Sequence, residues 1–182
     1  MPITIKVPAR EFWDERNEMF INTPETSLTL EHSLISISKW ETKYHKPFLE
    51  KTNELTTEEV IDYIRFMTIG KPVDDYVYLA ITKDNVTTIS DYIADSCTAT
   101  TFSNEKRAPR NGEFVTSELI YYWMVAYSIP FECEKWHINR LLTLIKICNV
   151  KNEKPKKMGR REHLSKQAAL NKARRAKYNS KG

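Results

Sequence analysis

The chain has 182 residues, of which 41% are hydrophobic and 11% are aromatic. These values are typical of a globular protein, so they exclude disorder throughout, and the length is enough for one ordinary domain with an appendage. The three cysteines cannot all pair, and no charged and apolar signal segment opens the chain, so we expect a reducing intracellular compartment. No apolar run approaches the roughly 18 residues of a membrane span, so no membrane partner is expected.

The charges are divided unevenly along the chain. Residues 1–150 carry 16 basic and 22 acidic side chains, a net charge of −6, and residues 151–182 carry 12 basic and 2 acidic side chains, a net charge of +10. Together these give the net charge of +4 of the whole chain. Because charge asymmetry bears on partners rather than on fold, the basic end is a candidate binding segment.

Three short segments near the N-terminus alternate apolar and polar residues, as half-buried strands do. They are ITIKV at 3–7, MFINT at 19–23 and SLTLE at 27–31. We expect them to form a small antiparallel sheet. Within residues 32–44, apolar side chains then recur at intervals of three and four, which predicts a helix.

The next helix has the clearest boundary signals. Thr56 followed by Glu59 is a capping box, in which the two side chains satisfy free backbone N–H groups. Gly70 and Pro72 stop the pattern, so we predict a helix over 57–69. Two short helices over about 74–82 and 84–94 follow, although the many β-branched residues leave a strand open for the first.

Regular periodicity then disappears between Cys97 and Phe114. We interpret this stretch as an exposed hairpin or arm, with a strand in TATTF at 98–102. Thr116 is placed to cap a hydrophobic helix over 117–127, and a further helix is predicted to start at Pro130 and run through Cys148.

Cys133 and His137 stand four residues apart and would share one face of that last helix, as two metal ligands can. A closed zinc site needs four ligands and a catalytic site usually three, and Cys97 and Cys148 are isolated. A nucleophilic Cys133 lacks a recognisable oxyanion hole and a third residue to orient a base. We therefore expect packing roles and predict no metal site.

Other chemistry is equally unsupported. The four glycines are too far apart to form a phosphate-binding loop. The acid pairs Glu58-Glu59 and Asp74-Asp75 lie in first turns of predicted helices, where capping and the helix dipole explain them. We predict no cofactor, no catalytic residues and no enzymatic activity.

The segment from Lys154 to Tyr178 is strongly basic and has high helix propensity, but it has few large aliphatic residues. Its cations could bind nucleic acid or an acidic protein partner, or they could simply be solvated. With a single aromatic residue, Tyr178, base stacking on a single strand is weakly supported. The candidate binding residues are Lys154, Lys156, Lys157, Arg160, Arg161, Lys166, Lys172, Arg174, Arg175 and Lys177.

Three segments carry a resemblance to a known family. They are SLTLEHSLISISKWETKYHKPFL at 27–49, CTATTF at 97–102 and ELIYYWMVAYSIPFECEKWHINRLLTLIKICN at 118–149. Over about residues 1–152 the chain resembles small proteins from the tail-gene region of long-tailed bacteriophages, and among these it is most similar to tail assembly chaperones. These segments contain no catalytic signature, and no position-specific functional residues transfer with the resemblance.

The resemblance implies a non-enzymatic protein of virion morphogenesis, made in the host cell cytoplasm. Such a chaperone binds the long helical tape-measure protein, covers its apolar surface and recruits tail-tube subunits. Separately from the resemblance, the basic tail could dock onto the acidic body of a neighbouring copy of the chain. Two other functions stay open: a nucleic-acid-binding accessory protein that acts through the basic tail, and a structural head or tail connector component.

A chaperone for amphipathic helices needs an apolar surface with polar edges. Tyr121, Tyr122, Trp123 and Met124 are four consecutive large residues, which a helix must point in several directions. Either some of them form a partner-binding surface or the surrounding helices bury them all.

The sequence as a whole predicts an α+β fold: a mostly helical single domain over residues 1–152, with a small N-terminal antiparallel β-sheet. A basic C-terminal tail, flexible or forming a single helix, is predicted over 153–182.

Overall fold

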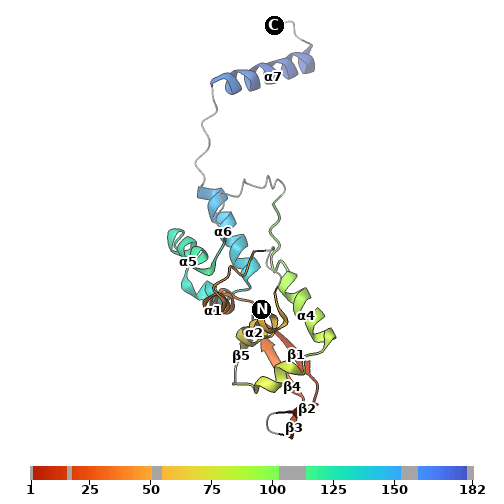
Figure 1. Cartoon of the computed structure of the whole chain (residues 1–182). Helices are drawn as coiled ribbons and strands as arrows, with labels where there is room; N and C mark the ends of the chain where they lie inside the picture. The colour runs from red at the N-terminus through yellow and green to blue at the C-terminus, as the bar shows by residue number, and fades with distance from the viewer. Residues whose placement is uncertain (1, 16–17, 51–54, 103–113, 153–159, 180–182) are drawn as a thin grey trace. The chain divides into compact units, whose positions relative to one another are not determined.

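The structure is a computed structural model that describes residues 2–15, 18–50, 55–102, 114–152 and 160–179. Within these ranges the fold is α+β, with small antiparallel sheets near the N-terminus followed by helices, as the sequence predicts (Figure 1). The chain divides into two compact units, Met1–Cys148 and Asn149–Gly182. The first unit holds the α+β domain, and the second contains the basic helix.

The strands form two consecutive antiparallel ladders. In the first, β1 (Ile3–Val7) pairs with β4 (Thr26–Leu30), and in the second, β2 (Arg10–Asp14) pairs with β3 (Met19–Thr23). Strand β2 was not predicted. Because β3 pairs with β2, the strands form two sheets and not the one sheet that the sequence predicted. The short strand β5 (Thr68–Ile69) pairs with β4 on its other edge.

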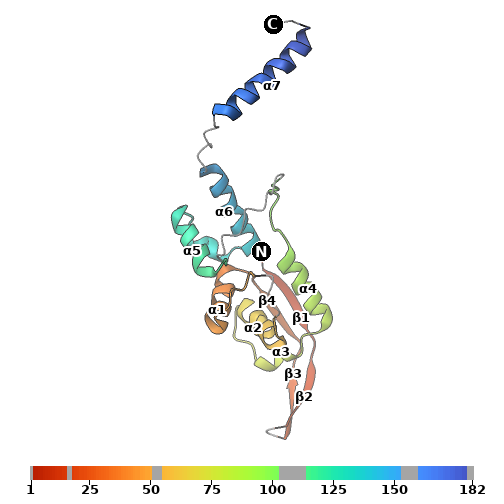
Figure 2. The ribbon, with the colours of Figure 1, turned by 45° about the horizontal axis from the view of Figure 1, so that its top comes forward.

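Pro8 and Pro24 lie between the two ladders, where each breaks the backbone pairing because proline has no N–H to donate. Beyond this break, the side chain of Thr23 starts the second ladder. Its Oγ1 accepts from the N–H of Arg10 at 3.2 Å and donates to the carbonyl oxygen of Arg10 at 2.9 Å. Figure 2 shows the β2–β3 pair continuing from the end of the β1–β4 pair.

The β1–β4 ladder buries one face. Ile5, Val7, Leu28 and Leu30 are each at most 4% exposed, and they alternate with exposed or half-buried residues along both strands. Because side chains alternate between the faces of a strand, a register shift of one residue would expose this apolar set. The register is therefore fixed by burial.

The two strand pairs, β1–β4 and β2–β3, together form what we call the N-terminal ribbon. The helices that follow this ribbon match most of the predicted segments. They are α1 (Leu34–Tyr44), α2 (Thr57–Met67), α3 (Asp75–Leu79), α4 (Lys83–Ala94) and α5 (Ser117–Ala126). Helix α2 ends two residues earlier than predicted because Thr68 and Ile69 turn into the extended conformation and pair with β4. The first of the two short helices is helical rather than a strand.

The predicted capping box on α2 is present. The N–H of Glu59 donates to Thr56 Oγ1 at 3.3 Å, and the N–H of Thr56 donates to Glu59 Oε2 at 2.8 Å. Asp74 likewise caps α3, since its Oδ1 accepts from the N–H of Tyr76 at 2.9 Å. The acid pairs at 58–59 and 74–75 each contribute one residue to these caps.

The predicted hairpin or arm after Cys97 is only partly within the described residues. Residues 98–102, expected to be a strand, form none, and neither do residues 114–116. The loop over 103–113 lies outside the described residues. The strand prediction for TATTF was therefore wrong: it rested on β propensity, and no neighbouring strand in the described chain supplies a partner there.

The helix predicted from Pro130 to Cys148 is interrupted. Phe131–Lys135 form a short 3₁₀ helix, η1, and α6 begins only at Ile138 and runs to Asn152. Between them, His137 makes an isolated antiparallel bridge with Ser33, and the N–H of Ile138 donates to the carbonyl oxygen of His32 at 2.9 Å. The chain extends at this point because it pairs with the segment before α1.

The core of the first unit lies where the ribbon, α1, α2, α5 and α6 meet. Leu34 and Trp40 of α1, Met124 of α5 and Leu141 of α6 are all fully buried. In the second unit, α7 spans Arg160–Tyr178. Its described side chains, Arg161 and residues 164–178, are exposed.

Replacing Met124 with alanine is expected to lower the free energy of unfolding by about 2–5 kcal/mol, because the change leaves a cavity in the core. Val125→Ala is the matched control. The side chain of Val125, next to Met124 in the sequence, is 63% exposed, so this substitution should change the free energy of unfolding by at most about 0.5 kcal/mol. Urea unfolding followed by circular dichroism measures both. Equal losses would contradict the orientation of α5.

Candidate protein-binding surfaces

The predicted partner-binding run lies on α5, and the helix does point its residues in different directions. Met124 is fully buried, Tyr121 and Trp123 are half-buried, and Tyr122 is 64% exposed. The hydroxyl of Tyr121 donates to Glu134 Oε2 at 2.9 Å, and burial together with Glu134 raises the pKa of Tyr121 to about 12. Within this run, Tyr122 is the residue available to a partner.

The exposed side of α5 carries a second apolar residue. Val125 follows Tyr122 by three positions, so the two share a helical face that we call the α5 outer face. Phe131 of η1 is also largely exposed, and its ring lies 6.4 Å from that of Tyr121. None of Tyr122, Val125 and Phe131 lines any of the cavities that are described below.

A larger apolar surface, which the sequence did not single out, is a groove between α2, α3 and α4. It consists of two adjoining cavities of about 420 and 240 Å³ that share Leu55, Val60, Ile64 and Val86. We call it the α2–α4 groove. Its other lining residues are Phe48, Thr57, Ile61, Tyr63, Tyr78, Leu79, Ile81, Ile89, Ser90 and Ile93.

The groove arises from two helical stripes that face each other. On α4, Val86, Ile89 and Ile93 recur at intervals of three and four, the spacing of one helix face. On α2, the facing stripe includes Val60 and Ile64. The sequence predicted helices from these intervals, but periodicity alone does not tell whether such a stripe is covered by another element.

The groove is open to solvent at its edge. Leu79 is 49% exposed and Val86 is 42% exposed, whereas Ile64 and Ile89 at its floor are 3% exposed. Thr57 and Ser90 add hydroxyl groups to a lining that is otherwise almost wholly apolar and aromatic. Sites that bind side chains of a partner typically have an apolar floor and a few polar groups among the lining residues.

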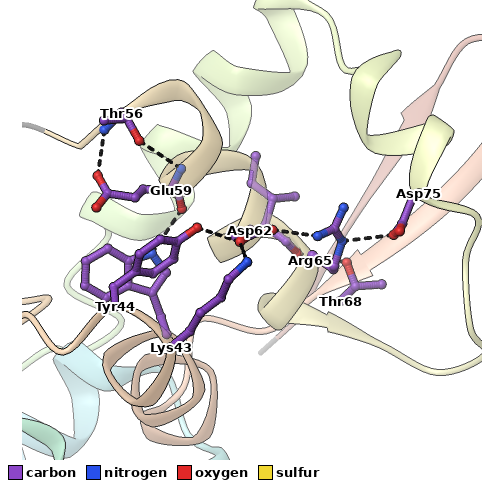
Figure 3. Close-up of polar contacts among 10 residues, drawn as sticks. Lys43, Tyr44, Thr56, Glu59, Asp62, Arg65, Thr68 and Asp75 are labelled. Atoms are coloured by element: carbon purple, nitrogen blue, oxygen red, sulfur yellow. Dashed lines mark hydrogen bonds and ion pairs between the residues drawn. The ribbon is translucent and has the colours of Figure 1, made fainter. Parts of the chain in front are cut away.

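The opposite face of α2 is fixed to α1 by a buried carboxylate, Asp62, which is 3% exposed (Figure 3). Its Oδ2 accepts from the Lys43 ammonium and from the Tyr44 hydroxyl, the latter at 2.6 Å. Its Oδ1 accepts from Arg65 Nη1 at 2.5 Å, and Arg65 in turn pairs with Asp75 at 3.1 Å. Asp62 therefore connects α1, α2 and the start of α3.

A second buried carboxylate, Glu59, lies one turn before Asp62 and makes further ties to α1. Lys46 Nζ donates to Glu59 Oε1 at 2.7 Å, while the other carboxylate oxygen serves the capping box. The indole Nε1 of the fully buried Trp40 donates to the backbone carbonyl oxygen of Glu59 at 3.0 Å. These bonds hold α2 on the side away from the groove.

The pKa values of both carboxyl groups lie below their ordinary range. For Asp62, burial by itself raises the pKa, but the hydrogen bonds from Lys43 and Tyr44 and the charges of Lys43 and Arg65 together outweigh it. For Glu59, the hydrogen bond from Lys46 is the largest cause of the lowered pKa. Both groups are therefore structural anions, with their oxygens occupied by partners within the chain.

A buried cluster of aromatic and imidazole rings joins α2 and α4 to the segments just before α1 and α6. His32 Nδ1 and the Tyr63 hydroxyl share a hydrogen bond of 2.5 Å, and the backbone N–H of His32 donates to the Tyr92 hydroxyl at 3.2 Å. The ring of His32 meets that of His137 edge to face at 4.9 Å. Burial, followed by the charge of His137, holds the pKa of His32 at about 3.

The structure does not bring Cys133 and His137 onto one helical face as the sequence predicted, because the chain extends between them. Both nitrogens of His137 are occupied: Nε2 donates to the Tyr92 carbonyl oxygen at 3.0 Å, and Nδ1 accepts from the N–H of Asn139 at 3.3 Å. Cys133 is buried, and burial raises the pKa of its thiol. Both residues have packing roles.

The basic candidates of the tail divide into two groups. Lys154, Lys156 and Lys157 lie outside the described residues, and Arg160 is the first residue of α7. The others are exposed along α7, at positions Arg161, Lys166, Lys172, Arg174, Arg175 and Lys177.

Across the described residues, no three histidine, cysteine or acidic side chains converge in a way that would hold a metal ion. No helix in the described part of the chain is both long and apolar enough to cross a membrane. Comparison of the chain with protein-family models, with curated proteins and with solved structures gives no significant match.

Asp62→Asn is expected to lower the free energy of unfolding by about 1–3 kcal/mol, since it removes a buried anion that accepts hydrogen bonds from two cations. Asp75→Asn is the control, because Asp75 is 74% exposed and an exposed pair with Arg65 contributes about 0–1 kcal/mol. Urea unfolding at pH 7 measures both. A loss at Asp75 as large as that at Asp62 would refute the role given to the buried anion.

Acid is expected to destabilise the fold from about pH 6.5 downward. In the folded chain the pKa of His32 is about 3, so its side chain stays neutral until the pH falls to that value. A histidine in the unfolded chain has a pKa near 6.5. The unfolded chain therefore binds more protons within this window, so stability present above pH 6.5 is lost as the pH falls toward 3. The urea midpoint should be lower at pH 5 than at pH 7.

The histidine variants test the origin of this acid sensitivity. His32→Gln should reduce the difference between the urea midpoints at pH 7 and pH 5. The difference that remains is expected to come from His137, because burial lowers the pKa of this histidine as well. His45→Asn at the exposed, left-handed end of α1 should leave the change intact. An unaltered pH dependence in His32→Gln would show that another group is responsible.

Proposed function

We propose that this chain is a non-enzymatic protein that binds an amphipathic helix of a partner in its α2–α4 groove, and that it acts in bacteriophage tail assembly as a chaperone. The observation that carries the proposal is the groove itself, an open apolar channel between two helices with a buried floor. Helix-in-groove recognition uses such a channel to receive side chains spaced by three and four residues.

The dimensions of the groove suit this mode of binding. Its larger cavity, about 420 Å³, has room for several aliphatic side chains of a partner helix. Leu79 and Val86, half exposed at the edge, would lose contact with water when a partner helix covers them, which is favourable for apolar surface. The hydroxyls of Thr57 and Ser90 are available to polar groups of the partner.

The resemblance in sequence to tail assembly chaperones supports one choice of partner. The tape-measure protein is a long helical protein with apolar surface, and it is the first partner that we propose for the groove. Tail-tube subunits or a second copy of the chain would then use another surface, for which we propose the α5 outer face, Tyr122 and Val125. The proposed place of action is the cytoplasm of the infected host cell.

The groove proposal predicts that Leu79→Glu combined with Val86→Glu abolishes co-purification of the tape-measure protein of the same virus after co-expression. Two carboxylates at the edge would have to be desolvated by an incoming apolar helix, which is costly. Because both side chains are half exposed, the free chain should keep its thermal midpoint. Circular dichroism verifies this.

Val125→Glu is the matched control, since it puts a carboxylate on the α5 outer face instead of the groove. It should retain the tape-measure protein and, if that face recruits other subunits, lose those instead. Undiminished capture by the double groove variant would exclude the groove as the binding site. Purified virions provide a further test, because a chaperone is absent from them and a connector component is retained.

A further inference from the structure

Helix α7 carries a dense set of cations without an apolar face. Between Arg160 and Tyr178 the sequence has seven basic residues and one acidic residue. Its three large apolar side chains, Leu164, Leu170 and Tyr178, are each at least 57% exposed, and they stand six and eight residues apart with polar residues such as Gln167, Asn171 and Arg174 between them, so they form no continuous stripe. The helix therefore has no stripe with which to join a hydrophobic core, and its charge is the main feature available for binding.

The cations of α7 flank one face of the helix on both sides. Successive residues turn by about 100°, so residues eleven apart lie on nearly the same line, about three turns from each other. Arg161 and Lys172 form one such line, and Lys166 and Lys177 form another. All four side chains are exposed.

A stripe of small residues runs between these two lines. Ser165, Ala169, Ala173 and Ala176 recur at intervals of four, four and three, so they share the face that the two lines of cations border. All four are exposed. From Ser165 onward the backbone of α7 can approach a concave surface closely along this face, while the longer basic side chains reach past it on either side. Glu162, the one acidic residue of α7, stands three positions before Ser165 at the N-terminal end of the same face.

We propose that α7 binds duplex DNA without sequence specificity, lying in the major groove with its small-residue stripe toward the base edges. The major groove, about 12 Å wide, admits an α-helix and has a phosphate backbone along each wall. The two lines of cations on α7 meet these two walls. At 19 residues the helix is about 28 Å long, so it can follow the groove over several base pairs.

The arrangement favours duplex DNA over other polyanions. The two lines of cations lie about 140° apart around the helix, so a flat acidic protein surface facing the stripe would meet both lines only at its margins, whereas the two walls of the major groove rise on either side of the helix. The major groove of double-stranded RNA is deep and too narrow for such a helix. Single-stranded nucleic acid is held largely by stacking on aromatic rings, and α7 has one aromatic residue, Tyr178, at its last position.

Relief of charge repulsion is a second contribution to binding. Lys172 and Arg175, and Arg174 and Lys177, are like charges three residues apart on the same helix, an arrangement that opposes helix formation. Isolated helices of this length are marginal in water. Phosphates that neutralise these pairs would favour the helical state, so binding and helix formation support each other.

The proposal is tested with the full-length chain and a fluorescein-labelled 30-base-pair DNA of mixed sequence, by anisotropy between 50 and 200 mM NaCl. A variant with Arg161, Lys166, Lys172 and Lys177 all changed to glutamine should lose affinity by at least tenfold at 50 mM salt. The slope of log K against log salt should become shallower by about three to four, since each phosphate contact contributes about 0.9.

The control changes the charge equally in the first unit, with glutamine in place of the exposed Lys6, Lys39, Lys71 and Lys83. This variant should keep most of the affinity and the salt slope. Equal losses in the two variants, or unaltered binding by the α7 variant, would overturn the proposal. Because neither set of changes touches the groove lining, the outcome is independent of tape-measure binding.

A second pair of variants distinguishes groove docking from general attraction of charge. Ala169→Leu puts a bulky side chain on the small-residue stripe and should weaken DNA binding severalfold at constant charge, whereas Ala168→Leu, off the stripe, should not. Binding that is insensitive to Ala169→Leu, or as tight to a duplex RNA of the same length, would refute major-groove docking. If the chain instead forms oligomers that dissociate in salt and binds no DNA, the proposal is wrong, and α7 binds the acidic surface of another copy of the chain.

Discussion

Buried carboxylates with fully engaged oxygens hold the helices of the first unit in place. Asp62 and Glu59 tie α2 to α1, and the buried carboxylate of Glu41 ties α1 to α5 by accepting from the N–H of Ser117 at 2.7 Å and from that of Phe48 at 2.8 Å. A buried charge is tolerated when hydrogen bonds and opposite charges replace its water, and here several partners do so. Because the bonds of Asp62 to Lys43 and Tyr44, and of Glu59 to Trp40, lie on the α1 side of α2, the opposite side is left to line the groove.

This division of α2 into a fastened face and an open face relates stability to the proposed function. The open face needs no rearrangement to receive a partner, since Ile64 and Ile89 already form a packed floor. Ordering of a binding surface before binding reduces the entropy lost on association. The ring cluster of His32, Tyr63, Tyr92 and His137 adds to this order by joining the helices on both sides of the groove to the segment before α1.

Much of the fold follows from local sequence signals, and the remainder depends on contacts between distant segments. The Thr56–Glu59 capping box and the alternation at 3–7 and 19–23 act within a few residues, so they are visible in the sequence. The extended break before α6 depends on the bridge between Ser33 and His137, and nothing near His137 in the sequence indicates it. The groove could not be predicted for the same reason: the stripe containing Val86 and Ile89 has the pattern of a buried face, and only the arrangement of α2 and α4 leaves its Val86 end open to solvent. The sequence predicted that the four large residues 121–124 of α5 point in several directions, but it did not predict which of them would face solvent.

The interrupted N-terminal ribbon also protects the chain against aggregation. Strand β1 is at an edge of its sheet, and a long unbroken edge would offer backbone groups to a strand from another molecule. Pro8, directly after β1, has no N–H to donate, and Asn85 of α4 occupies the carbonyl oxygen of Lys6 with its side-chain amide at 3.1 Å. Intermolecular β-pairing could therefore extend over only a few residues on either side of the proline. The break that divides the ribbon into two ladders thus also limits amyloid-like growth from its edge.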